Sequence, residues 1–350
     1  MRGKICMLTG LALLLAAAPC AAGPPHTPGP VGELKRGEKL LGAGDVDGAI
    51  RAFSAAIRAA PRDPRGYYQR GVCHERKKRA DAAIADYRQA VKLRPGFAEA
   101  QNNLGALLHE KGEQARAQAH LRLAVRAKPD YGEAWFNLGL VLEEQGKGQD
   151  AVQAYKRAAR LRPRDVDVRI NLAAALHRSG DREGALRQMK MAATLNPKDA
   201  MVRFNYGSLL MEQKREAEAE PQLRAAVRLE PTHARAWQRL ALVQGRLGHL
   251  EPALASIQQA VKLMPRAAAV RCDQGRLFRK AGKVGRAIAS YRAALKLDPG
   301  FARAHLLIGL ALASQGKCRP ARRAFAAFVK TQKNTPPGTL EKLTKRCRGK

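Results

Sequence analysis

The sequence contains few aromatic residues, few acidic residues and no long apolar run. Aromatic side chains make up 5% of the 350 residues, so the interior must be built mainly from smaller apolar side chains. The chain contains 30 Asp and Glu residues and 64 Lys and Arg residues. Its net charge is therefore +34, and the protein is strongly basic. The apolar run from Ile5 to Ala18 is shorter than the ~20 residues that a transmembrane helix needs.

Motifs of the common enzyme and metal-binding classes are also missing. The chain contains no CxxC pair, no HExxH, no glycine-rich phosphate loop and no Gly-x-Ser-x-Gly element. The eight histidines are scattered along the chain. We therefore expect no catalytic residues, no metal, no cofactor and no small-molecule substrate.

The N-terminus is typical of a secretory signal peptide. Arg2 and Lys4 precede the apolar run, and small residues end it at Ala22. We expect residues 1–22 to be removed and the protein to be exported, as a periplasmic or secreted protein. Lipidation of Cys20, which would make an outer-membrane lipoprotein, is the weaker alternative because Pro19 precedes it. Residues 23–29 form a Pro/Gly spacer.

The most regular feature of the chain is a column of eight prolines spaced 34 residues apart. Such spacing indicates a stacked array of one helical unit, because each unit must end at the same place for the next to dock. These prolines are Pro61, Pro95, Pro129, Pro163, Pro197, Pro231, Pro265 and Pro299.

Small residues repeat in the same frame and predict two closely packed helices in each unit. Alanine stands twelve residues before each proline, as at Ala151, and again five before it, as at Ala158. A third small column contains glycine in seven positions and alanine in two: Gly37, Gly71, Gly105, Gly139, Ala173, Gly207, Ala241, Gly275 and Gly309. A large apolar column follows in the second helix, as at Tyr155 and Met189.

This order of residues resembles the tetratricopeptide repeat (TPR), most clearly in the fourth unit with Trp135, Leu138, Gly139, Tyr155 and Pro163. The resemblance implies an all-α, right-handed α-solenoid of about nine 34-residue helix-turn-helix repeats, with first helices lining a concave groove and second helices facing outward. The expected repeats are 30–63, 64–97, 98–131, 132–165, 166–199, 200–233, 234–267, 268–301 and 302–335, and residues 336–350 form a C-terminal capping helix.

Four asparagines, Asn103, Asn137, Asn171 and Asn205, stand two residues before the third small column in consecutive repeats. An amide can pair with both the N–H and the C=O of a peptide, and the resemblance suggests that this column faces the groove. The alternative is that these asparagines only position neighbouring helices.

Charged residues flank the asparagines on the side expected to face the groove. Glu99, Glu133 and Asp167 make its middle acidic, and Arg239 and Arg276 make its C-terminal end basic. The column after the small residue never holds asparagine, so a chaperone-type carboxylate clamp is not expected.

Basic residues also recur three and seven positions before the proline, and residues four apart share one helix face. They predict a basic convex stripe on the second helices, made of Arg88, Lys92, Arg122, Arg126, Lys156, Arg160, Arg224, Arg228, Arg292 and Lys296. The stripe could bind an anionic membrane or polymer surface, or it could simply be a solvated face. Nucleic acid is an unlikely partner because stacking aromatics are missing from the stripe.

Cys318 begins the last second helix and Cys347 ends the expected cap. A disulfide between them would close a loop of about 30 residues and stabilise the fold by roughly 3–4 kcal/mol. The alternative is buried free thiols.

The sequence thus predicts a non-enzymatic scaffold that binds an extended peptide or protein segment in the groove. The second hypothesis is an electrostatic adaptor that docks on a membrane, lipopolysaccharide or nucleic acid through the stripe.

Overall fold

The computed structural model describes residues 29–332, 336 and 338–345, and it divides the chain into two compact units. The first unit ends at Gly112 and the second begins at Glu113. The signal peptide and spacer up to residue 28, and Cys347, lie outside the described residues. The first unit contains five helices: α1 (Pro30–Gly42), α2 (Val46–Ala59), α3 (Pro64–Arg76), α4 (Ala80–Leu93) and α5 (Ala98–Glu110).

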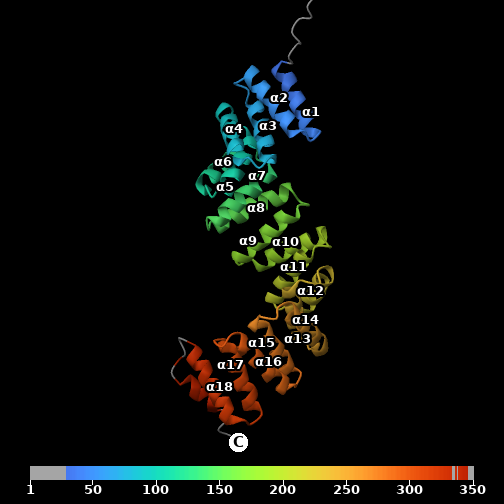
Figure 1. Cartoon of the computed structure of the whole chain (residues 1–350), viewed down its shortest axis with the longest axis vertical. Helices are drawn as coiled ribbons and strands as arrows, with labels where there is room; N and C mark the ends of the chain where they lie inside the picture. Colours follow the sequence, from blue (N-terminus) through green and yellow to red (C-terminus); the bar gives the residue numbers. More distant parts are fainter. Residues whose placement is uncertain (1–28, 333–335, 337, 346–350) are drawn as a thin grey trace, which may run out of the picture. The chain divides into compact units, whose positions relative to one another are not determined.

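The second unit contains fourteen helices in its described residues (Figure 1). They are α6 (Gln114–Ala127), α7 (Gly132–Glu144), α8 (Gly148–Leu161), α9 (Val166–Arg178), α10 (Arg182–Leu195), α11 (Ala200–Glu212), α12 (Glu216–Leu229), α13 (Ala234–Leu247), α14 (Leu250–Leu263), α15 (Ala268–Lys280), α16 (Val284–Leu297), α17 (Ala302–Ser314), α18 (Cys318–Thr331) and α19 (Thr339–Lys345). No strand occurs in the described part of either unit, which confirms the predicted all-α solenoid.

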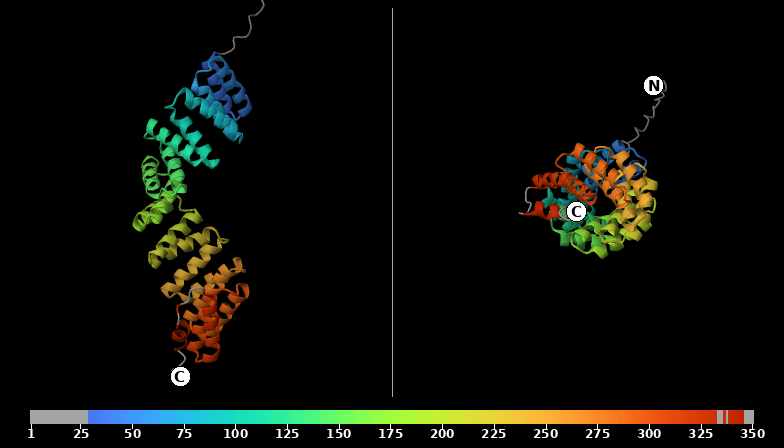
Figure 2. Two further views of the ribbon diagram at one scale, coloured as in Figure 1. Left: turned by 90° about the vertical axis from the view of Figure 1, so that its left-hand side faces the viewer. Right: turned by 90° about the horizontal axis from the view of Figure 1, so that it is seen from below.

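Within each unit, consecutive helices lie side by side as hairpins (Figure 2). In the second unit α7 packs on α8, α8 on α9, and so on to α18. The first helices of neighbouring hairpins also touch, since α11 contacts α13, α13 contacts α15 and α15 contacts α17. They therefore form a continuous row, and this row carries the candidate site.

The residues of the third small column determine how closely the two helices of a hairpin approach. A Cβ added at Gly139 would lie 2.5 Å from the ring of Tyr155, and one at Gly275 would lie 2.4 Å from the ring of Tyr291. Phe53, Tyr87 and Phe325 approach Gly37, Gly71 and Gly309 in the same way. Glycine therefore stands where the partner is aromatic.

Helix ends are defined by turns and caps encoded locally. Gly146 and Gly180 connect the two helices of their hairpins with φ of +73° and +89°, a conformation that favours glycine. The Asp199 carboxylate accepts hydrogen bonds from the N–H groups of Met201 and Val202 at the start of α11. Such a cap contributes about 1 kcal/mol.

The last described helix, α19, packs against α18. Leu343 contacts the apolar cluster around Phe325. Among the described residues, no helix combines the length and apolar character needed to cross a membrane.

Candidate binding groove

Three pockets follow the row of first helices in the second unit, and adjacent pockets share a lining residue. The first pocket lies between α9 and α11 and has a volume of about 270 Å³. The second lies between α11 and α13, with about 330 Å³, and the third between α13 and α15, with about 380 Å³. Glu212 lines the first two pockets, and Arg246 lines the last two. The three pockets therefore lie next to one another along the row of first helices, and we refer to this row of pockets as the groove.

The first pocket is lined by both apolar and polar side chains. Met189 and Leu209 are apolar, whereas Asn205, Ser208 and Glu212 are polar. The His177 Nε2 atom lies 3.3 Å from the Glu212 Oε2 atom. The buried Ser208 Oγ has no hydrogen-bond partner among the described residues. Because this atom is shielded from solvent, the polar groups that a ligand can reach in this pocket are those of Asn205 and Glu212.

The third pocket is strongly basic. Arg246, Arg276, Arg279 and Lys280 line it, together with Leu242, Leu277 and Gly245. No carboxylate appears among these lining residues. The second pocket is mixed, because Glu212 and Glu216 face Lys214, Arg239 and Arg246 there. The groove therefore changes from neutral or acidic to basic along its length.

The four asparagines expected in the groove have different environments. Asn205 lines the first pocket, and its amide makes no hydrogen bond within the described residues. The Asn171 amide donates to the backbone oxygen of Asp167, 2.9 Å away in its own helix. In the first unit, Asn103 donates to the Tyr87 hydroxyl at 3.2 Å. Asn137 is half-buried on α7 and lines none of the three pockets.

Of the charged residues expected in the groove, some line the three pockets and others do not. Arg239 lines the second pocket and Arg276 the third. Asp167 and Glu133 are exposed on α9 and α7, outside the three pockets. Glu99 is half-buried on α5, in the first unit. The structure thus brings Asn205, Arg239 and Arg276 together in one groove.

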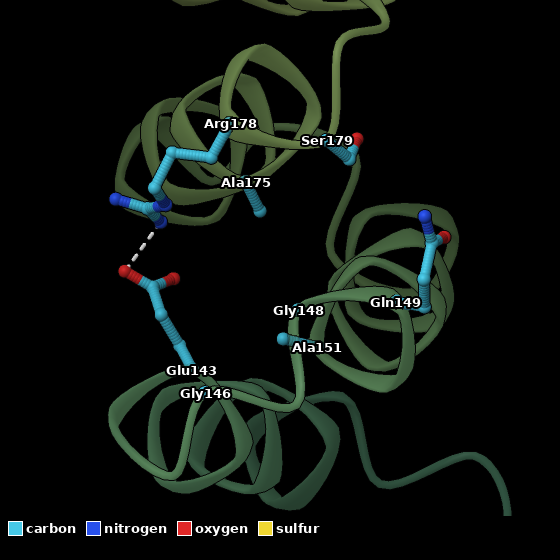
Figure 3. Close-up of a pocket in the computed structure, with 8 residues that line it drawn as sticks. All are labelled: Glu143, Gly146, Gly148, Gln149, Ala151, Ala175, Arg178 and Ser179. Atoms are coloured by element: carbon cyan, nitrogen blue, oxygen red, sulfur yellow. Dashed lines mark ion pairs between the residues drawn. The ribbon is translucent and has the colours of Figure 1, made fainter.

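A further pocket of about 360 Å³ lies between α7, α8 and α9 (Figure 3). Its Glu143 and Arg178 side chains point toward each other and form an ion pair with 2.5 Å between Oε1 and Nη2. The Tyr155 hydroxyl donates to the other oxygen of Glu143 at 3.2 Å. Since both charges are already satisfied, this pocket offers a ligand less than the groove does.

The basic stripe is found on the second helices α4, α6, α8, α12 and α16. Nine of its ten residues are exposed, and Lys156 is half-buried. Arg224 forms an ion pair with Glu220. Arg126, Arg160, Arg228 and Lys296 stand in the last turns of their helices, where a cation complements the helix dipole. Part of the stripe thus has a local structural role.

Cys73 and Cys272 are buried free thiols. Burial raises the pKa of each thiol to about 11. The pairing of Cys318 with Cys347 stays a prediction, because Cys347 lies outside the described residues. The described part of the chain contains no cluster of His, Cys, Asp and Glu suited to a metal ion.

The sequence reasoning missed Ser208, Glu212, Arg246 and Lys280. Their signal was the 34-residue frame, because Ser208, Leu242 and Arg276 occupy one column and Glu212, Arg246 and Lys280 another. These two columns line the groove beside the asparagine column.

Family models match most of the chain. A model of the cilia and flagella-associated protein 70 C-terminal domain matches residues 9–230. Tetratricopeptide repeat models match residues 234–266 and 275–316. No curated protein matches the chain at a significant level.

Solved structures share the fold. A tetratricopeptide repeat protein from Parabacteroides merdae is 20% identical over 72% of this chain and 99% of its own, with a TM-score of 0.51. PilF from Pseudomonas aeruginosa is 20% identical over 57% of this chain and 90% of its own, also with a TM-score of 0.51. The first family model alone covers more than half of the sequence. The chain therefore belongs to the tetratricopeptide repeat family, whose members are generally non-enzymatic scaffolds for protein–protein interaction.

Proposed function

We propose that this protein is a scaffold that binds an extended segment of a partner protein along the groove over α9, α11, α13 and α15. The observation that carries the proposal is that three pockets lie next to one another, with Glu212 and Arg246 each lining two of them. A compact ligand needs one pocket, whereas a series of adjacent pockets suits an extended chain. Packed helices lie roughly 10 Å apart, so an extended peptide places about three residues over each repeat.

The polar atoms of the first pocket match the requirements of a peptide backbone. Each peptide unit carries one donor and one acceptor, and the Asn205 amide can satisfy both. A peptide group that is buried unpaired in the pocket costs about 1–3 kcal/mol. A segment whose backbone pairs with the Asn205 amide is therefore favoured.

Site-specific photo-crosslinking tests the location of the partner segment. A benzophenone amino acid replaces Ala174, which lines the first pocket, and in a matched variant it replaces Ala255, which is exposed on α14. In the native host we expect protein adducts at position 174 and few at position 255. Adducts at 255 with none at 174 would place the partner outside the groove and contradict the proposal.

The captured segment, made as a synthetic peptide, then tests the role of the asparagines. Replacing Asn103, Asn137, Asn171 and Asn205 together by Ala should weaken binding by over tenfold, because a polar peptide loses its hydrogen-bond partners. Asn205→Ala should account for most of the loss. Asn171→Ala is the control, since its amide bonds to its own helix. Circular dichroism should show unchanged helix content, and unchanged affinity in the fourfold variant would exclude the asparagines from binding.

A second candidate function is docking on an anionic surface through the basic convex stripe. The observation that favours it is the exposure of nine stripe residues on the second helices. Binding of this kind falls steeply with salt. Co-sedimentation with anionic lipid vesicles at increasing salt tests it, and a flat salt dependence would exclude it.

We also propose that the protein is exported, on the basis of its N-terminal residues. N-terminal sequencing of the mature protein should begin at Gly23. A chain that begins at Met1 would exclude cleavage, and a lipid-modified Cys20 would indicate an outer-membrane lipoprotein.

A further inference from the structure

We propose that the pocket between α13 and α15 is a subsite for the carboxylate side chains of an acidic stretch in the partner. The partner segment would then be charge-segregated, with this acidic stretch over α13 and α15 and a donor-rich stretch of Lys, Arg or amide residues over α9 and α11. This inference rests on the proposed function. It adds the chemical class of the ligand and the order of its charged stretches along the groove.

The first argument is the composition of the pocket walls. Arg246 comes from α13, and Arg276, Arg279 and Lys280 come from α15. The other lining residues, Leu242, Leu277 and Gly245, carry no charged side chain. Four cations on two facing helices produce a positive potential, which attracts and orients an anionic ligand.

The second argument is that internal partners neutralise only part of this charge. Arg246 Nη1 lies 3.1 Å from Glu216 Oε1, and Arg276 Nη1 lies 3.1 Å from Asp273 Oδ1. Lys280 Nζ donates to the backbone oxygen of Gly245, which carries no net charge. No carboxylate among the described residues pairs with Arg279, which is exposed. Two positive charges are thus available for a ligand.

The change of charge along the groove favours an acidic peptide over a uniform polyanion. Glu212 and Glu216 line the adjacent second pocket, and Glu212 also lines the first. A nucleic acid or polyphosphate that continued along the groove would place phosphates beside these carboxylates, which is unfavourable. A peptide can end its acidic stretch at α13. The two outer pockets are about two helix spacings apart, so roughly six extended residues separate them.

The experiment compares two twelve-residue peptides of one composition. The segregated peptide carries four Glu at one end and four Lys at the other, separated by four Ser, and the mixed peptide carries the same residues in alternation. Each is labelled with a fluorophore, and its binding to the full chain is measured by anisotropy. We expect the segregated peptide to bind at least tenfold more tightly. Equal affinities would overturn the segregation of charge.

Paired substitutions locate the acidic subsite. Arg279→Gln removes one pocket cation, and Arg292→Gln removes one exposed stripe cation from α16 of the same repeat, with the same change in net charge. Arg279→Gln should weaken the segregated peptide about tenfold, because hydrogen bonds to charged groups are among the strong ones. Arg292→Gln should change it less than twofold. Equal losses in the two variants would overturn the subsite.

A competition experiment distinguishes a carboxylate ligand from a phosphate ligand. The cross-linking result distinguishes failure of this inference from failure of the proposed function. Hexaglutamate should displace the segregated peptide at lower concentration than pyrophosphate or a single-stranded oligonucleotide of equal charge. Stronger displacement by either phosphate compound would overturn the assignment to carboxylates. If the Ala174 variant still captures a partner while these peptide tests fail, the groove binds proteins but this subsite is wrong.

Discussion

The two ends of the groove are built on the same repeat positions but have opposite chemistry. At the α9–α11 end, one column provides Ser208 and its neighbouring column provides Glu212. At the α13–α15 end, the same two columns provide Arg276 and Lys280. The helices repeat, so the fold places equivalent backbone positions along the groove. The side chains at these positions vary, so each repeat sets the charge of its own part of the groove.

The largest difference that we expect between the two ends concerns thiol reactivity. Cys272 on α15 is 1% exposed, whereas Ile170, at the same repeat position on α9, lines the first pocket. Burial raises the pKa of Cys272 from 9.0 to about 11, so the thiolate fraction at pH 8 falls about a hundredfold. Iodoacetamide labelling followed by mass spectrometry should therefore be slow at Cys272 and much faster at the engineered thiol of Ile170→Cys.

The same pKa predicts how stability depends on pH. Cys272 is protonated in the folded chain up to about pH 11 but loses its proton near pH 9 when unfolded. Its contribution to stability is therefore complete below pH 9 and is lost as the pH rises toward 11. A Cys272→Ala variant should show a smaller decrease in unfolding free energy across this range. Rapid labelling of native Cys272 at pH 8 would contradict its burial.

A second, smaller difference concerns the small column beneath the groove. Gly275 faces the Tyr291 ring in α16, whereas Ala173 occupies its position in α9 and packs with Met189. A Cβ at residue 275 would lie 2.4 Å from the ring, so Gly275→Ala should lower the unfolding free energy by about 1–3 kcal/mol. Ala173→Gly should cost only about 0.5–1 kcal/mol.

Denaturation with urea measures both effects, and a double variant tests their cause. Gly275→Ala combined with Tyr291→Met reproduces the pair found at Ala173 and Met189. We expect the double variant to lose less stability than the sum of the two single changes, since the clash requires the ring. Strict additivity would show that the ring is not responsible.

The smallest effect that we expect is at Ser208, whose buried Oγ has no partner. Ser208→Ala should raise the unfolding free energy by up to about 1 kcal/mol, because it removes an unsatisfied polar group. The control is Ser314→Ala on α17, where the hydroxyl donates to the Ala311 oxygen at 2.8 Å and no gain is expected. Because this hydroxyl is shielded from solvent, the same Ser208→Ala change should leave the affinity for the captured peptide unchanged. Improved stability with a clear loss of affinity would show that the peptide reaches the hydroxyl.

Much of the fold could be predicted from the sequence because its determinants are local and repeated. Proline ends each unit, a positive-φ glycine such as Gly146 turns the chain between helices, and small residues face large ones at helical spacing. In the nine repeats, all five aromatic residues of the large column stand opposite glycine, and both alanines stand opposite Met189 or Ile257. This size matching is visible in the sequence once the frame is known.

The candidate site was less predictable. The asparagine column identified the row of first helices, but the sequence could not distinguish Asn205, whose amide is available, from Asn171, whose amide is bonded to its own helix. Rotamers and neighbours decide that difference. The sequence likewise could not show that Arg178 and Tyr155 satisfy both oxygens of Glu143.

The sequence by itself determined the repeat, the all-α fold and the direction in which charge changes along the first helices, because these depend on residue type at a fixed spacing. Tertiary structure alone decided which charges are available to a ligand. Arg178 and Arg279 stand in adjacent columns and look alike in the sequence. Arg178 on α9 nevertheless pairs with the carboxylate of Glu143 on α7, whereas Arg279 pairs with no carboxylate of the described residues. The physical reason is that the availability of a charge depends on the three-dimensional position of its partner, which the 34-residue repeat alone does not specify.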